Sequence, residues 1–201
     1  FPPFVEFLNK RHLSEDVATT YMLGFAPNKS SITEYLNSIP STSEKEFALS
    51  VAEEIGLIKK DKLNPKSHYD TFRDRIIFPI WDQNGQVIGY TSRSIREGQN
   101  PKYLNSPESK VFNKRNLLYG LHLAKTSIRE KDFAILVEGN MDQIALYKSG
   151  FQNSVAVMGV ALGQSSLDRL VGLTKNFYLA LDSDNAGFMA MERINRQFLE
   201  K

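Results

Sequence analysis

The pattern of apolar and polar positions changes near residue 130 and then alternates regularly to the end of the chain. Short apolar runs predict strands at 133–138, 154–159 and 177–182. Segments with a helical period predict helices at 141–150, 165–174 and 185–200. Strand–helix alternation at this spacing predicts right-handed crossovers and a parallel sheet flanked by helices.

The first half of the chain follows a different pattern. Two helices are predicted near the N-terminus, with Ser14 as N-cap of the second and with Gly24 and Pro27 ending it. Further short helices are predicted after residue 28, one of them ending at Gly56. The polar stretch at 59–70 is predicted to be an exposed loop.

A β-hairpin is predicted in the middle of the chain. Two β-rich runs flank Asn84-Gly85, the dipeptide that best tolerates the positive φ angles of a tight turn. Pro79 cannot donate to a strand ladder, so the first strand is expected to carry it at an edge or a bulge. The stretch 97–115 is expected to be irregular and basic, before a helical pattern resumes at 117–128.

Composition places the chain among globular proteins. Hydrophobic residues make up 41% and charged residues 24%, and no apolar run approaches the ~18 residues of a membrane span, so no membrane partner is expected. The absence of cysteine excludes disulfides and thiolate zinc sites in this sequence and fits a reducing cytoplasm. His12, His68 and His122 show no ligand spacing and are interpreted as structural or surface residues.

The net charge of +2 conceals an uneven distribution. Residues 73–115 carry eight bases and four acids, whereas residues 130–201 carry seven bases and nine acids. A basic middle beside an acidic end suits a polyanion held next to a metal site. Ordinary surface charge explains the same numbers, and charge alone favours that interpretation.

Acidic residues close two of the three predicted C-terminal strands. Glu138 ends the first strand and is followed by Gly139, while Asp182 and Asp184 end the third, with Gly187 shortly after. In an open parallel sheet, ligands bind beyond the carboxyl ends of the strands. If these strands are close together, three carboxylates converge on one point.

Three converging carboxylates repel one another unless a cation neutralises them. Oxygen ligands favour a hard divalent ion, so Mg²⁺ or Mn²⁺ is the predicted cofactor. A structural alternative stays open, in which Asp184 is only a helix N-cap, Glu138 a solvated strand end, and Asp142 a charge complementing a helix dipole.

The motifs V-E-G-N-M-D and L-D-S-D-N-A-G resemble the TOPRIM domain shared by DnaG-type primases, topoisomerases and some nucleases. The resemblance implies that Glu138 is a catalytic acid and that Asp182 and Asp184 hold the metals. Asp142 occupies a position that often carries a second acid of the first motif.

The upstream sequence distinguishes among these enzymes. F-R-D-R-I-I-F-P-I, G-x-V-I-G-Y, P-K-Y-L-N-S-P-E and F-N-K-x-x-x-L-Y-G-L resemble the basic half of the bacterial DnaG-type primase core. The opening F-L-N-K-R-H-L-S and L-G-F-A-P resembles the entry to that core. The expected fold class is α/β, with an α+β nucleic-acid-handling subdomain at residues 1–127 and a TOPRIM domain with a Rossmann-like sheet at 128–201.

By this resemblance, the expected activity is metal-dependent nucleotidyl transfer that makes short RNA primers on single-stranded DNA. The implied partners are the template, ribonucleoside triphosphates, the RNA primer and a replicative helicase, at the replication fork in a bacterial cytoplasm. Zinc is implied only in an N-terminal module that this sequence lacks. A further acidic motif and the helicase-binding region are expected beyond residue 201, and the chain, which opens at Phe1, is expected to be a piece that is inactive by itself.

Several residues of the basic region are expected to contact nucleotide or template. Arg and Lys supply phosphate contacts, and an aromatic or amide side chain can stack on or hydrogen-bond to an unpaired base. The residues assigned on this basis are Arg73, Arg75, Arg93, Lys102, Tyr103, Asn105 and Lys114. In the alternative interpretation, Arg73 and Arg75 form an exposed strand edge and Tyr103 is a core residue.

Some positions depart from the family pattern. Asn140 replaces the usual aromatic residue, Thr91-Ser92 replaces a glycine pair, and Arg115 replaces a glycine. Two rival functions remain: a TOPRIM nuclease or topoisomerase, and a non-catalytic nucleic-acid- or regulator-binding module. The eight tyrosines offer no recognisable context for a topoisomerase nucleophile.

Overall fold

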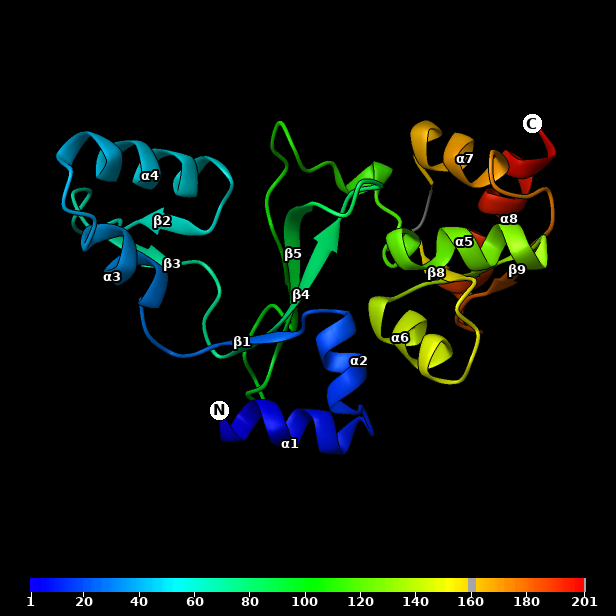
Figure 1. Cartoon of the computed structure of the whole chain (residues 1–201), viewed down its shortest axis with the longest axis horizontal. Coiled ribbons are helices and arrows are strands. Elements are labelled where there is room, and N and C mark those ends of the chain that lie inside the picture. The colour runs from blue at the N-terminus through cyan, green and yellow to red at the C-terminus, as the bar shows by residue number, and fades with distance from the viewer. Residues whose placement is uncertain (159–161, 201) are drawn as a thin grey trace. The chain divides into compact units, whose positions relative to one another are not determined.

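The computed structural model describes residues 1–158 and 162–200 (Figure 1). The chain forms two compact units, one of residues 1–79 and 88–112 and the other of residues 80–87 and 113–201. Among the described residues, no helix combines the length and hydropathy needed to cross a membrane.

The first unit contains a four-stranded sheet in the order β1-β4-β5-β6. Its strands are β1 (Gly24–Ala26), β4 (Arg75–Trp81), β5 (Val87–Ser94) and β6 (Tyr103–Asn105), of which Ile80, Trp81 and Val87 belong to the second unit. β6 lies within the stretch that was expected to be irregular, so that prediction is wrong there. Three residues are too few to show an alternating pattern in the sequence.

The predicted hairpin is confirmed. β4 and β5 are neighbours in the sheet, and Gly85 has a φ of +80°, which glycine adopts without steric cost. The Asp82 carboxylate accepts hydrogen bonds from the amides of Asn84 and Gln86 at 2.8 and 2.9 Å, which closes the turn. β4 is a central strand rather than an edge strand, but its registered pairs with β1 end at Ile77, so Pro79 lies beyond that ladder.

Helices α1 (Pro2–Lys10) and α2 (Glu15–Thr20) form as predicted, and the Ser14 hydroxyl accepts a hydrogen bond from the Val17 amide as an N-cap. The prediction that Gly24 ends the second helix is wrong, because α2 ends at Thr20 and Gly24 begins β1.

A smaller layer of the first unit consists of α3 (Ser31–Asn37) and α4 (Thr42–Glu54) beside the hairpin of β2 (Ile58–Lys60) and β3 (His68–Asp70) (Figure 1). The prediction of one exposed loop at 59–70 is therefore wrong at both of its ends. Asp70 explains why: its buried carboxylate accepts hydrogen bonds from the amides of Ile32 and Thr33 and caps α3. That partner is distant in sequence, so no local pattern reveals it.

The second unit contains a three-stranded parallel sheet in the order β8-β7-β9, which confirms the predicted alternation of strands and helices. Its elements are η1 (Lys114–Asn116), α5 (Leu121–Lys131), β7 (Ala134–Val137), α6 (Asn140–Lys148), β8 (Ser154–Ala156), α7 (Gln164–Val171), β9 (Phe177–Ala180) and α8 (Asn185–Leu199). The helical pattern predicted at 117–128 becomes a helix only from Leu121, after Gly120 with φ +82°.

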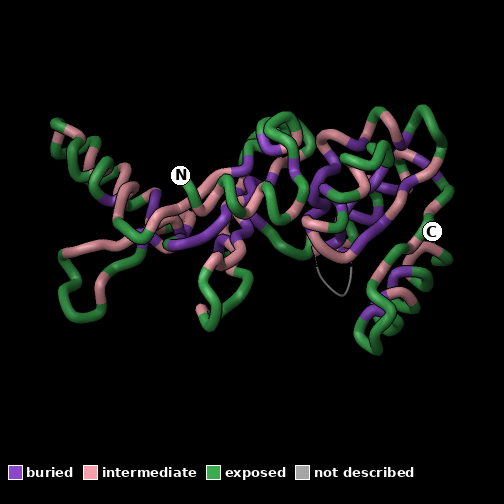
Figure 2. The backbone as a smooth tube through the Cα atoms, turned by 90° about the horizontal axis from the view of Figure 1, so that it is seen from below, coloured by how far each residue is buried: buried purple, intermediate pink, exposed green. Residues whose placement is uncertain are grey.

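The core of the second unit lies against one face of this sheet. A buried cluster joins Ala134 and Leu136 of β7 to apolar residues of α5, α7 and α8. Because side chains alternate along a strand, Val137 points to the opposite face. α8 is amphipathic: Ala190 and Ile194 are buried, whereas Phe188 is exposed. Figure 2 shows buried and exposed positions alternating along this helix toward the C-terminus.

Candidate functional site

The carboxylates that were predicted to converge lie at the ends of two neighbouring strands. β7 and β9 are paired in parallel, and the last registered pair joins Val137 to Ala180. Glu138 follows Val137 directly, and Asp182 lies two residues beyond Ala180. The expectation that these strands are adjacent is confirmed, and it brings the two acidic motifs to one edge of the sheet.

Electrostatics shows that these acids interact. Desolvation by burial raises the pKa of Glu138 first, and the negative charges of Asp182 and Asp184 raise it further. A hydrogen bond from the Asp182 backbone opposes these effects, and Asp142 adds a smaller repulsion. The charges of Asp182 and Asp184 therefore disfavour the ionised form of Glu138, and a bound cation would relieve that repulsion.

Asp184 and Asp142 each have a structural role as well. Asp184 is the N-cap of α8, and its Oδ1 accepts a hydrogen bond from the Gly187 amide at 2.8 Å. Asp142 Oδ2 accepts from the Gly139 amide at 3.1 Å at the start of α6. The N-cap alternative for Asp184 thus describes a real contact, but the cap engages one carboxylate oxygen and leaves the other for a ligand.

The donor set at this edge fits a hard divalent cation in one specific way. Among residues 1–158 and 162–200, no group of three or more acidic or histidine side chains is arranged so that it could hold a metal ion. Mg²⁺ is commonly held by one or two carboxylates together with water and substrate phosphates. One or two carboxylates from this edge would match that oxygen-only arrangement, with water and phosphate as the other ligands.

The basic residues of the first unit divide into exposed and buried groups. Arg73 is exposed, and its guanidinium lies 4.9 Å from the centre of the Tyr69 ring. Lys102 is also exposed. Arg93 donates a hydrogen bond of 2.7 Å to the Tyr103 hydroxyl across the β5–β6 ladder. Tyr103 is 43% exposed, so the alternative that it is a core residue is wrong.

The other assigned residues have different surroundings. Arg75 is only 3% exposed, and its guanidinium donates to the carbonyls of Pro101 and Lys102. Asn105 is half-buried, and its side-chain oxygen has no hydrogen-bond partner within the described part of the chain. Lys114 belongs to the second unit, where it is exposed on η1. Within the first unit, the structure brings Arg93 into contact with Tyr103 and places Arg93 and Lys102 on one hollow.

Arg93 and Lys102 line one open hollow of about 650 Å³ in the first unit. Lys10 and Arg11, at the end of α1, line the same hollow, as does Arg96. Sequence reasoning missed these three cations as site residues. A Lys-Arg pair at a helix end is common, and only the folded chain brings it next to the 93–102 segment.

Among the positions that depart from the family pattern, Thr91 and Ser92 have a local explanation, whereas nothing in the structure explains Asn140 or Arg115. Thr91 and Ser92 are both buried, and the Ser92 hydroxyl donates to the Leu104 carbonyl across the β5–β6 ladder. Asn140 is 4% exposed at the start of α6.

The sequence of this chain matches two known protein families. Residues 2–125 match the family model described as "DNA primase catalytic core, N-terminal domain". The chain belongs to the DNA primase catalytic core family. Residues 132–201 match the Toprim domain, a domain that generally binds metal. The suspected DnaG-type primase family and the α/β fold class with a TOPRIM domain are thereby confirmed.

Curated primases agree with this family assignment. The chain is 39% identical to a DNA primase of Aquifex aeolicus over 93% of its own length and 36% of that protein. It is 36% identical to a DNA primase of Listeria monocytogenes over 97% of its length and 30% of that protein. The chain thus spans about a third of the length of these primases.

Solved primase structures show the same fold. A DNA primase domain from Pseudomonas aeruginosa matches with a TM-score of 0.84 and 35% identity, covering 97% of this chain and 59% of that one. The zinc-binding and RNA polymerase domains of the Aquifex aeolicus primase match with a TM-score of 0.82 and 36% identity, covering 94% of this chain and 44% of that one. A DnaG primase catalytic domain bound to single-stranded DNA matches with a TM-score of 0.81 and 32% identity, covering 94% and 59%.

Proposed function

We propose that this chain is the strand-handling region and TOPRIM site of an enzyme that synthesises RNA primers on single-stranded DNA. One observation carries the proposal: in a chain whose residues 2–125 match the primase core family, Glu138 and the Asp182–Asp184 motif follow two paired parallel strands. A related primase domain binds single-stranded DNA, which supports the same partner for this chain.

We further propose a division of labour in which residues 1–127 handle template and nucleotide and residues 128–201 supply the reaction site. Arg73, Arg93 and Lys102 hold the phosphates of the strand or of the incoming ribonucleoside triphosphate as charged donors. Tyr103, with nearly half of its surface exposed, offers a face on which an unpaired base stacks. Asn105 and Lys114 are further contacts in this proposal.

The proposed reaction joins the 3′-hydroxyl of one ribonucleotide to the α-phosphate of the next and releases pyrophosphate. Glu138, Asp182 and Asp184 are the residues that would hold Mg²⁺ or Mn²⁺. When bound, such an ion neutralises the charge that develops on the phosphoryl oxygens. A replicative helicase as partner and a zinc-bearing module are further parts of the proposal, and no residue of this chain is assigned to either.

Glu138→Gln in the intact parent protein tests this function. The substitution removes the negative charge with little change in shape, so primer synthesis with Mg²⁺ and ribonucleoside triphosphates should fall to background. Binding of labelled single-stranded DNA should stay nearly unchanged. Glu130→Gln, a change at an exposed acid of α5, is the matched control and should keep full synthesis. Near-normal synthesis by Glu138→Gln would exclude the assigned role.

A further inference from the structure

Three polar contacts join residues 73–75 to the 94–102 segment within the first unit. They are the Gln99 side-chain amide to the Arg73 carbonyl at 3.1 Å, the Arg96 guanidinium to the Asp74 carboxylate at 2.7 Å, and the Arg75 guanidinium to the Pro101 carbonyl at 2.8 Å. Two exposed cations, Arg73 and Lys102, belong to the two segments that these contacts join. The spacing of their backbones therefore depends on the contacts.

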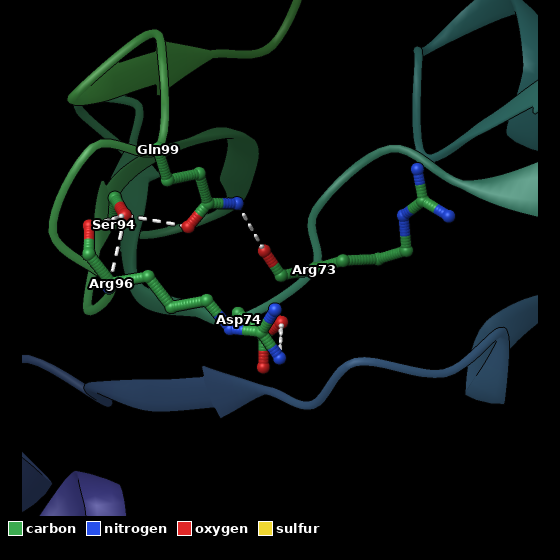
Figure 3. Close-up of polar contacts among 5 residues, drawn as sticks. All are labelled: Arg73, Asp74, Ser94, Arg96 and Gln99. Carbon is green, nitrogen blue, oxygen red and sulfur yellow. Dashed lines mark hydrogen bonds and ion pairs between the residues drawn. The ribbon is translucent and has the colours of Figure 1, made fainter.

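Gln99 is the neutral member of this set. Figure 3 shows its amide between two partners, with the nitrogen directed at the Arg73 carbonyl and the oxygen accepting from the Ser94 hydroxyl. Ser94 also accepts a hydrogen bond from the Arg96 amide, so the segment is fixed at both sides of the turn. In the same view the Arg73 side chain extends away from these contacts, so Gln99 holds the Arg73 backbone without engaging the guanidinium, which lies over the Tyr69 ring.

Asp74 gives the chain an unusual turn at this point. It has a φ of +52°, a left-handed conformation that is uncommon outside glycine and persists where surrounding contacts enforce it. Its carboxylate pairs with Arg96, and its carbonyl accepts a hydrogen bond from the Ile95 amide at 3.2 Å. The two neighbouring arginines differ accordingly: Arg73 is exposed and Arg75 is buried.

Arg75 is occupied by protein groups. At 3% exposure it is almost inaccessible, and both terminal nitrogens of its guanidinium donate to main-chain carbonyls of Pro101 and Lys102. Desolvation lowers its pKa from the ordinary value, in agreement with that burial. Its charge is directed at the backbone that carries Lys102 rather than at solvent.

We propose that Arg75 and Gln99, together with the Asp74–Arg96 ion pair, form a brace that positions Arg73 and Lys102 for binding phosphates. Arg75 and Gln99 are positioning residues and do not touch the strand. The inference rests on the proposed function, because it assumes that Arg73 and Lys102 contact a nucleic-acid backbone. A brace reduces the freedom that these two side chains lose on binding and so strengthens their contacts.

Gln99→Ala tests the brace without removing a charge. Gln99 is half-buried, so its loss should leave the fold intact, which a thermal melt followed by circular dichroism checks. Affinity for a fluorescently labelled oligothymidylate, measured by anisotropy across a range of salt concentrations, should fall about fivefold. The slope of log affinity against log salt should become shallower by about 0.7, the value of one lost single-strand phosphate contact. A partly unfolded sample would lose affinity but keep its slope.

Gln152→Ala is the matched control, because Gln152 is an exposed glutamine in the turn before β8 of the second unit. In an Arg73→Ala background, Gln99→Ala should have a smaller effect, because the Arg73–phosphate contact that Gln99 positions is already lost. If Arg73→Ala weakens binding while Gln99→Ala changes neither affinity nor slope, the brace is refuted. The proposed contact of Arg73 with the strand is then still supported. If Arg73→Ala is itself without effect, the proposed strand contact fails and the inference fails with it.

Discussion

Lys102 is the residue for which the proposed strand contact makes the simplest prediction. It is exposed and lines the basic hollow of the first unit. Lys102→Ala should weaken binding of single-stranded DNA of every sequence and flatten the salt slope by about 0.7, because a lysine–phosphate contact releases counterions but reads no base. Anisotropy titrations with two unrelated oligonucleotides at several salt concentrations measure both effects.

Lys62→Ala removes another exposed lysine, from the loop between β2 and β3, and should change neither the affinity nor the salt slope. Unaltered affinity and slope for Lys102→Ala would show that Lys102 does not touch phosphate.

At the scale of single residues, the sequence predicts the acidic site better than the basic one. Glu138, Asp182 and Asp184 each end a strand, and strand ends are visible in a local pattern of apolar residues. The environment of Arg75 depends on the carbonyls of Pro101 and Lys102, which are 26 and 27 residues away in the chain. No local pattern indicates that this arginine is buried while Arg73 is exposed.

At the scale of secondary structure, long elements are visible in the local sequence pattern, whereas short ones depend on residues distant in the chain. The helices and strands after residue 130 are predicted because each shows its own period. β1, β2, β3 and β6 have three residues each, and their pairing partners lie elsewhere in the chain, so the sequence shows turns or loops there.

Gly187 shows how closely one element is fitted to the acidic motif. It is buried in the first turn of α8, and a Cβ added there would overlap the Asp182 carbonyl oxygen. Its φ is not in the left-handed region, so helix propensity alone would favour alanine by about 1 kcal/mol. We expect Gly187→Ala to lower stability instead, by roughly 1–3 kcal/mol, because α8 must move away from Asp182.

Urea denaturation followed by circular dichroism measures this change. Gly24→Ala is the control, since nothing lies within 4 Å of a Cβ added at that position. A stabilised Gly187→Ala protein would show that the start of α8 is not tightly packed against the motif.

At the scale of the whole molecule, the hairpin tip at residues 80–87 belongs with the second unit although its strands also serve the sheet of the first. Trp81 stacks on His122 of α5 with ring centres 5.1 Å apart, and Lys125 donates to the Gln83 carbonyl. The sequence predicts the hairpin itself, but the assignment of its tip depends on these tertiary contacts.

This contact predicts that acid weakens the second unit. Burial, assisted by the charge of Lys125, lowers the pKa of His122 from 6.5 to about 4. The unfolded chain therefore binds a proton in this range and the folded chain does not, so stability should decrease as pH falls from 6.5 to about 4 and then level off. Allowing for the partial exposure of the ring, the loss should be on the order of 1–2 kcal/mol.

The other acidic groups with shifted pKa values change stability in a different pH range or in the opposite direction, so the effect of His122 can be measured separately. The lowered pKa of Asp82 reduces stability mainly below its ordinary value of 3.8, and the raised pKa of Glu138 favours folding as pH falls. Hydrogen exchange of β7 measured between pH 7 and 4, corrected for the intrinsic rate, should report the loss in the native protein. His122→Phe keeps an aromatic ring against Trp81 and removes the titration, so its β7 protection should change less over the same range. Equal pH dependence in the two proteins would show that His122 does not couple protonation to the stability of this unit.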